Sequence, residues 1–221
     1  VKEHLFLGLL NLDQHRHELK NAVYKTMGDI AITLYVHAGT LKNGITYLKV
    51  RSEYLEAWGL EKDDVLHEAL LNSYRILPPR IYDFKKMMYT PGYAGEDFLN
   101  MDPYFISDKK KKEGICLSVK GLSNGAVAVL YPGVIKKLVE FMDGGFYVVF
   151  SSVHEALIYS SKLCSLEELE NLLRTSNARM TFQKEFLTDK VYYYCKEEDK
   201  FIMLRGSMKM LVTTIRMDEE N

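Results

Sequence analysis

Several classes of protein are excluded by what this sequence contains little of. Its 221 residues include only three cysteines, Cys116, Cys164 and Cys195, without a C-x-x-C pair, so neither a disulfide scaffold nor a cysteine zinc motif is present. Lysine and arginine number 29 against 30 acidic residues, so no bulk charge favours nucleic acid or an anionic membrane. The apolar runs are far shorter than the roughly 20 residues of a bilayer span. We therefore expect a cytoplasmic protein with no membrane segment.

The composition nevertheless allows a substantial core. Hydrophobic residues make up 47% and charged residues 27% of the chain, as in ordinary folded proteins. At this length, one large domain or two small ones can bury a core. The sequence starts at Val1, and an apolar run at residues 5–10 follows almost at once. Because a natural start so close to a core element is rare, we expect further residues upstream.

Hydrophobic periodicity and turn residues predict an alternation of strands and helices. Strands are predicted at residues 5–11, 29–37, 45–50, 114–120, 126–130, 146–150, 156–159, 191–195 and 201–204. Helices are predicted at residues 12–27, 52–58, 62–74, 83–88, 132–142 and 165–176. Asn43-Gly44 is a hairpin signal because both residues tolerate positive φ. The last residues are charged and are expected to fray.

The order of these elements predicts the α+β class. Strands that are adjacent in sequence, with helices between the pairs, favour mixed or antiparallel sheets with hairpins over a regular parallel fold. Residues 91–102 begin with Pro91, a turn signal, and are rich in glycine and acidic residues. This composition predicts a linker or loop. We therefore expect two α+β lobes, at residues 1–90 and 103–221.

The sharpest candidate site is the polar segment that follows the strand predicted at residues 146–150. It contains Ser151, Ser152, His154 and Glu155. A functional interpretation makes His154 a general base or a metal ligand, with Glu155 or a serine such as Ser152 assisting. The alternative is a polar turn whose hydroxyls satisfy backbone groups. Because neighbouring residues on a strand face opposite sides, His154 and Glu155 can share a site only if the backbone bends there.

Metal and thiol chemistry receive little support from the sequence. His67-Glu68 and His154-Glu155 lack the second histidine that a helical zinc-protease motif places four residues after the first. His15 and His17 diverge on a helix, because successive positions are about 100° apart. The cysteines have apolar or aromatic neighbours, which is typical of core thiols. We therefore predict no metal and no cofactor.

Nucleic-acid binding is also weighed and is not favoured. Residues 109–112 are four lysines, but Asp108 and Glu113 flank them, and an exposed loop is the simpler interpretation. A nucleic-acid surface would need these lysines to join Lys136 and Lys137 on one face. Tyr192, Tyr193 and Tyr194 could stack bases, but they are equally expected in any tyrosine-rich sheet.

The order of several short segments resembles an uncharacterised bacterial family, a domain of unknown function found in gut-dwelling anaerobes. The segments that carry the resemblance lie at residues 9–19, 28–32, 66–73, 125–133 and 150–155. Members of that family have proline where this chain has Phe150, whereas Ser151, Ser152, His154 and Glu155 match its pattern. The resemblance implies a shared lineage and a cytosolic setting, and it implies no reaction.

Our leading functional hypothesis is a domain that binds a protein partner or a small-molecule ligand without catalysis. It predicts that Ser151, Ser152, His154 and Glu155 line a binding surface. The alternative is a hydrolase-like enzyme that uses His154 as base with Glu155 or Ser152. That alternative predicts another acidic or histidine side chain within hydrogen-bond reach of His154.

Overall fold

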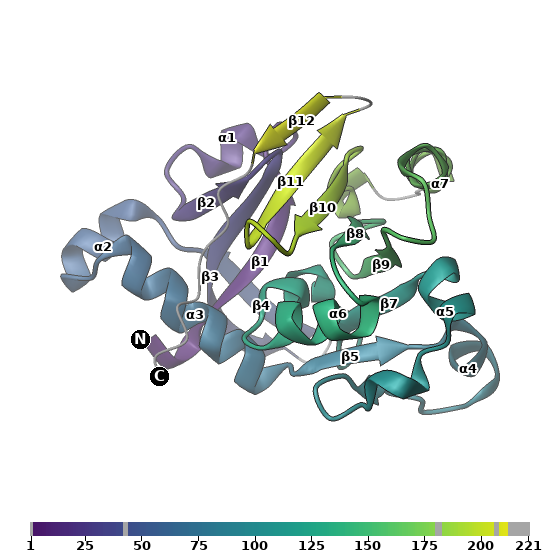
Figure 1. Cartoon of the computed structure of the whole chain (residues 1–221). Coiled ribbons are helices and arrows are strands. Elements are labelled where there is room, and N and C mark those ends of the chain that lie inside the picture. Colours follow the sequence, from purple (N-terminus) through teal and green to yellow (C-terminus); the bar gives the residue numbers. More distant parts are fainter. Residues whose placement is uncertain (1, 42–43, 180–182, 206–207, 212–221) are drawn as a thin grey trace.

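We describe the chain from a computed structural model that covers residues 2–41, 44–179, 183–205 and 208–211. Helices and antiparallel sheets both contribute, so the prediction of the α+β class is confirmed. The strands form two sheets of four and eight strands, and all strand pairs among the described residues are antiparallel. Figure 1 shows the smaller sheet beside the β10–β12 end of the larger one.

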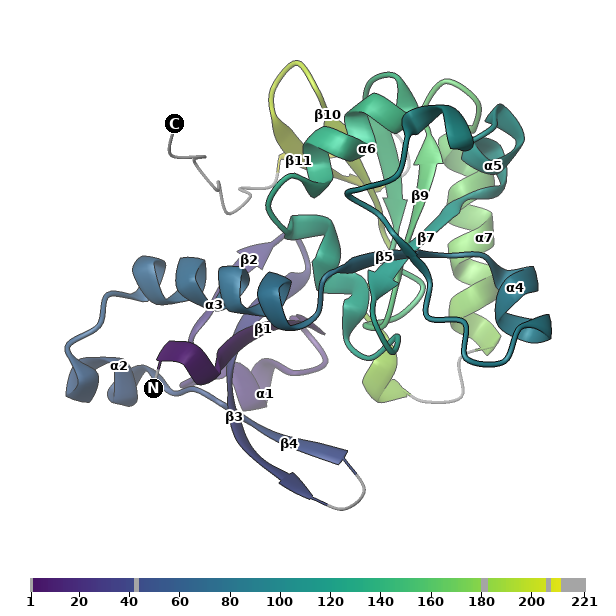
Figure 2. The same cartoon turned by 90° about the horizontal axis from the view of Figure 1, so that it is seen from below.

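The smaller sheet is built around one long strand, β3. It comprises β1 (Leu5–Asn11), β2 (Tyr24–Met27), β3 (Ile30–Leu41) and β4 (Gly44–Lys49). Both β1 and β2 pair with the first part of β3, and β4 pairs with its second part after a bulge between His37 and Gly39. Figure 2 shows the β3–β4 hairpin extending away from the rest of the molecule.

The larger sheet has the order β12-β11-β10-β8-β9-β7-β5-β6. Its strands are β5 (Pro79–Tyr82), β6 (Glu96–Asp97), β7 (Ile115–Val119), β8 (Phe146–Val149), β9 (Ala156–Ser160), β10 (Val191–Cys195), β11 (Lys200–Arg205) and β12 (Met208–Leu211). Because β8 and β9 pair directly, residues 150–155 form the connection at one end of this hairpin. That connection is the predicted polar site.

The helices lie around the sheets and between them. The α-helices are α1 (Arg16–Leu19), α2 (Ser52–Trp58), α3 (Lys62–Ile76), α4 (Phe84–Tyr89), α5 (Asp108–Glu113), α6 (Val134–Met142) and α7 (Leu166–Arg179). The 3-10 helices are η1 (Lys2–His4), η2 (Pro103–Phe105), η3 (Gly125–Leu130) and η4 (Gln183–Glu185). Helix α3 packs along β1, where the Ser73 hydroxyl accepts a hydrogen bond from the Leu7 backbone amide at 2.9 Å.

Two hydrophobic clusters occupy opposite faces of the larger sheet. The main cluster takes Phe146 and Val148 from β8, and it continues through η3 and α3 into the smaller sheet. The second cluster takes Val149 from the other face of the same strand and joins it to Leu169 and Leu173 of α7. This alternation is what a strand produces when both faces are covered. Helix α7 is therefore fixed to the sheet beside the 150–155 connection.

The main cluster includes residues from before and after residues 91–102. In addition, β5 comes from the predicted N-terminal lobe and pairs with β7 from the predicted C-terminal lobe. The boundaries at residues 1–90 and 103–221 stay a prediction.

Two predicted elements are wrong. Residues 12–27 were expected to be one helix, but only α1 is helical, and residues 24–27 pair with β3 as β2. Leu19, Val23 and Met27 are all buried at a spacing of four, so the chain imitates a helical face without forming one. Residues 126–130 were expected to be a strand and instead belong to η3. All of η3 is buried, and a short apolar run has no periodicity that separates helix from strand.

Smaller differences concern three further segments. Residues 109–112 lie in α5 rather than in a loop, because the Ser107 hydroxyl caps that helix. Strand β5 was not predicted, and its first residue is Pro79, a position where a strand tolerates proline. The Asn43 side of the predicted hairpin turn and the charged residues after 211 lie outside the described residues.

Candidate functional site

The connection between β8 and β9 turns sharply, so consecutive side chains can face one surface. Residues 151–154 form bends, and the Ser152 hydroxyl accepts a hydrogen bond from the backbone amide of His154 at 3.0 Å. The Ser118 hydroxyl of β7 donates to the carbonyl of His154 at 2.6 Å. These bonds fix the backbone around His154. The bend that a shared site for His154 and Glu155 requires is present.

The His154 imidazole lies between two other segments of the chain. Its Nδ1 accepts a hydrogen bond from the backbone amide of Asn124 at 3.1 Å. Because Nδ1 is the acceptor, a neutral ring carries its proton on Nε2. That Nε2 lies 3.4 Å from Oε1 of Glu185 in η4. The backbone amide of Val153 also donates to the carbonyl of Glu185 at 2.9 Å, which holds η4 beside the connection.

A second polar pair lies next to this imidazole. The Ser151 hydroxyl donates to Oε1 of Glu155 at 2.5 Å. Ser151 and Glu155 are half-buried, and Ser152 is buried. Within the described residues, neither serine of the connection has a hydrogen bond to the His154 ring.

These side chains line one open groove with a volume of about 850 Å³, which we call the polar groove. Its lining also includes one face of α7 and Glu185 of η4. The lining residues are Ser151, Ser152, His154, Glu155, Asn171, Leu172, Thr175, Ser176, Arg179 and Glu185. All four residues predicted from the sequence are therefore on one surface. With a neutral imidazole, two carboxylates and one guanidinium leave the lining with one net negative charge.

The α7 wall and Glu185 were not predicted. Asn171, Thr175 and Arg179 recur every four residues, opposite the buried Leu169 and Leu173. That polar stripe was a readable signal for a helix face turned toward solvent or a ligand. No local signal connects Glu185 to His154, because their contact depends on how the chain folds back after α7.

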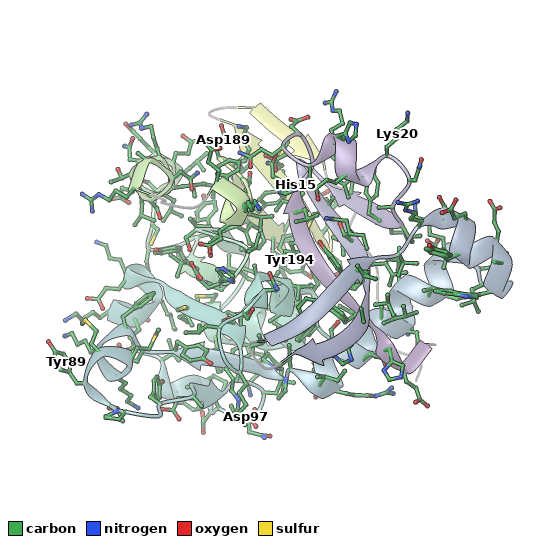
Figure 3. The ribbon with its side chains drawn as sticks, turned by 180° about the vertical axis from the view of Figure 1, so that it is seen from behind. His15, Lys20, Tyr89, Asp97, Asp189 and Tyr194 are labelled. Carbon is green, nitrogen blue, oxygen red and sulfur yellow. The ribbon has the colours of Figure 1, made fainter. Side chains whose placement is uncertain are left out.

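The other histidines considered from the sequence do not join this groove. His15 bonds to Glu18 at 3.2 Å, and Figure 3 shows it near α1, on the smaller sheet's side of the molecule. His67 lies on α3, and neither His17 nor His67 lines the polar groove. Among the described residues, no group of three or more histidine, cysteine or acidic side chains is placed to hold a metal ion.

The two features considered for nucleic-acid binding are placed as follows. Of the lysines in α5, Lys110 pairs with Asp83, Lys111 lies 3.3 Å from Asp108, and Lys109 lies 3.7 Å from Glu113. These pairs balance much of the positive charge locally. Tyr192 and Tyr194 are buried in the main cluster, so they are part of the core rather than an exposed stacking surface.

One further sequence pattern reaches the site. Residues 121–125 read Gly-Leu-Ser-Asn-Gly, which matches the G-x-S-x-G pattern. The expectation that the chain has no such nucleophile motif was therefore wrong. A Cβ atom at Gly125 would lie 2.0 Å from the Ser118 hydroxyl and 2.7 Å from the carbonyl of His154. The close approach therefore requires glycine. Asn124, the residue before this glycine, has a positive φ of 53°, and its amide donates to the imidazole.

A model of a family of unknown function, DUF5688, matches residues 1–196. The chain belongs to the DUF5688 family. The matched range includes the whole polar groove, and the predicted resemblance to a domain of unknown function is confirmed. No curated protein and no solved structure matches the chain. In the described ranges of this DUF5688 protein, no helix has both the length and the hydropathy to cross a membrane.

Proposed function

We propose that this protein binds a small polar ligand in the polar groove. The observation that carries the proposal is the convergence of the four residues singled out from the sequence with a polar face of α7. The volume of about 850 Å³ is within the range of small-molecule sites, which is roughly 300–1,000 Å³. A metabolite is a better fit than a protein partner, because the lining has one apolar residue, Leu172, and interface centres are richer in apolar and aromatic side chains.

The charges of the groove narrow the chemistry of this ligand. Within the described residues, Arg179 has no ion pair and is placed to take a carboxylate in a two-pronged contact. Glu155 and Glu185 oppose a ligand with several negative charges. A neutral or singly charged molecule with hydroxyl, amine or carboxylate groups fits this balance. Nucleic acid does not fit it.

A thermal-shift screen of polar metabolites on the whole chain tests the proposal. A ligand at about 100 times its Kd stabilises the native state by about 2.7 kcal/mol, which raises the melting temperature clearly. Arg179→Gln should remove the shift. Lys184→Gln is the matched control. It removes a positive charge from η4, and Lys184 does not line the groove. The proposal fails if no compound shifts the melting temperature, or if both variants respond like the unmodified chain.

The hydrolase-like alternative is favoured by one observation, the carboxylate of Glu185 beside His154 at 3.4 Å. Its expected helpers are less well placed. Ser152 is occupied by the His154 backbone amide, and Glu155 by the Ser151 hydroxyl. With those helpers no nucleophile contacts the base, so we rank ligand binding first. Hydrolysis of p-nitrophenyl acetate tests this alternative. If Ser152 and Glu155 are the helpers of His154, the variants Ser152→Ala and Glu155→Gln should be inactive.

We also propose that the protein acts in the bacterial cytoplasm. The support is that its three cysteines are free thiols, one of them buried. Thiol counting of the protein purified without reductant from its native host should give three reactive groups after denaturation. Fewer would contradict this setting.

A further inference from the structure

The loop before η3 places a serine beside His154. The G-x-S-x-G pattern at residues 121–125 joins β7 to η3, and in serine hydrolases this pattern presents the nucleophile on a turn between a strand and a helix. Ser123, at its centre, is exposed. Among the described residues its hydroxyl has no hydrogen-bond partner. It is therefore accessible to a substrate.

Covalent geometry limits how far this serine is from the imidazole. The amide nitrogen of Asn124 lies 3.1 Å from Nδ1 of His154. The Cα of Ser123 is two bonds from that nitrogen, at most about 2.9 Å away. The Cα of Ser123 is therefore within about 6 Å of Nδ1. The serine Oγ lies about 2.4 Å from Cα, so a rotamer directed at the ring places the hydroxyl within roughly 3.6 Å of Nδ1.

Such a rotation would exchange one bond for another. In the structure, the lone pair of Nδ1 is occupied by the Asn124 amide. When the Ser123 hydroxyl donates to Nδ1 instead, that amide is released. In the G-x-S-x-G arrangement, the amide of the residue after the nucleophile is a donor of the oxyanion hole. The group displaced from His154 is therefore the group that the reaction needs next.

Glu185 completes the arrangement on the other side of the ring. Its carboxylate lies 3.4 Å from Nε2 and favours the imidazolium that forms when Nδ1 takes a proton. The order serine, histidine, glutamate along this chain differs from the orders in α/β-hydrolases, chymotrypsin and subtilisin. That difference is no obstacle, because such triads are defined by geometry rather than by sequence order.

We propose that Ser123, His154 and Glu185 form an acyl-transfer centre that hydrolyses a small carboxylic ester. His154 and Glu185 line the polar groove and Ser123 lies just outside its lining, so the ester extends from the groove past the imidazole to Ser123. Ser123 Oγ bonds to the carbonyl carbon while its proton passes to Nδ1 of His154. The ester C–O bond then breaks, and the leaving alkoxide takes that proton. Water repeats the two steps on the acyl-serine and releases the acid. This inference rests on the proposed groove as the ligand site and adds a nucleophile that the hydrolase-like alternative lacks.

Covalent labelling tests the nucleophile directly. The whole chain is treated with a fluorophosphonate, and the labelled peptide is identified by mass spectrometry. We expect the label on Ser123. His154→Gln should slow labelling roughly 100-fold or more, the usual contribution of a general base. Ser123→Ala should abolish it. Ser52→Ala removes an exposed hydroxyl from α2 and should have no effect.

Glu185 is a positioning residue and needs a readout that a merely structural role would not move. Glu185→Gln should slow both labelling and hydrolysis of p-nitrophenyl acetate about tenfold, and Glu185→Asp should recover part of the rate, with unchanged circular dichroism in both variants. Loss of the rate with no recovery in Glu185→Asp would overturn its assigned role.

The outcomes separate this inference from ligand binding. Labelling of another serine, of none, or of Ser123 at the same rate in His154→Gln overturns the acyl-transfer centre. If metabolites still stabilise the chain through Arg179 in that case, the groove remains a binding site. If labelling succeeds but no metabolite binds through Arg179, the chemistry stands and the location of the substrate in the groove is wrong.

Discussion

The two sheets are joined by a buried phenol, and removal of its hydroxyl should cost more stability than removal of the hydroxyl of a second phenol on the same strand. Tyr192 of β10 is 0% exposed. Its hydroxyl lies 2.7 Å from Oδ1 of Asp29, in the turn between β2 and β3, and 2.8 Å from the carbonyl of Met27. The Thr188 hydroxyl donates to the other oxygen of Asp29 at 2.8 Å. Asp29 therefore connects the smaller sheet to the larger one.

Tyr192→Phe keeps the ring and removes only the hydroxyl. Burial, and then the Asp29 carboxylate, raise the pKa of Tyr192, so the phenol stays a donor through the neutral range. A hydrogen bond to a charged acceptor contributes about 1.5–3 kcal/mol. Asp29 keeps its bonds from Thr188, so we expect the free energy of unfolding to fall by about 2 kcal/mol.

The matched control is Tyr194→Phe. Tyr194 is on the same strand and the same face, but its hydroxyl donates to Asp199 in the β10–β11 turn. Because Asp199 is exposed to solvent, loss of this partly buried contact should cost only about 0.5 kcal/mol. Urea denaturation followed by circular dichroism measures both variants. Equal losses, or a loss below about 0.5 kcal/mol for Tyr192→Phe, would refute the idea that this hydroxyl joins the sheets.

Three further predictions concern packing and the buried thiol. Gly125→Ala should lower the free energy of unfolding by about 2–3 kcal/mol, because the new Cβ overlaps the Ser118 hydroxyl. Adding Ser118→Ala should restore part of that free energy. No loss of stability in urea denaturation would contradict the close approach. Leu173→Ala should lower the free energy of unfolding by about 2–4 kcal/mol, and the neighbouring Leu172→Ala by under about 1 kcal/mol. The reason is that Leu173 is 1% exposed and Leu172 is 40% exposed. Comparable unfolding midpoints for the two variants would be evidence against the packing of α7. Burial, and then the Glu155 charge, raise the pKa of the Cys116 thiol from its ordinary 9.0 to about 12, so the thiol stays neutral in the folded state. Its contribution to stability is present below pH 9.0 and is lost as the pH rises toward 12. Iodoacetamide at pH 8 should leave Cys116 unmodified until the protein is denatured, and early modification seen by mass spectrometry would contradict this.

Much of the fold could be predicted because its local signals are strong. The strand at Leu5–Asn11 has the predicted bounds, and α7 begins close to the predicted residue 165, where Ser165 and Glu168 form a capping box. The failures occur where burial is imposed from outside the segment. Met27 is buried because β2 pairs with β3, and η3 is buried because it lies between the two sheets. No pattern within either segment records those neighbours.

The candidate site divides in the same way. The residues from Ser151 to Glu155 could be predicted, since polar side chains that interrupt a buried hairpin are visible in the sequence. Arg179 and Glu185 reach the groove only because α7 crosses the face of the sheet and the chain then returns. Those contacts join residues about 30 apart, and periodicity, which reports on one element at a time, contains no information about them.

The separate cluster beneath α7 has a consequence for how the groove can open. Leu169 and Leu173 contact Val149, Tyr159 and Val191, and these five buried residues do not belong to the main cluster. Because so small a cluster holds the helix, its detachment exposes much less apolar surface than global unfolding does. One wall of the groove can therefore swing away while both sheets stay folded, which gives a bulky molecule a route of entry that the static surface does not show.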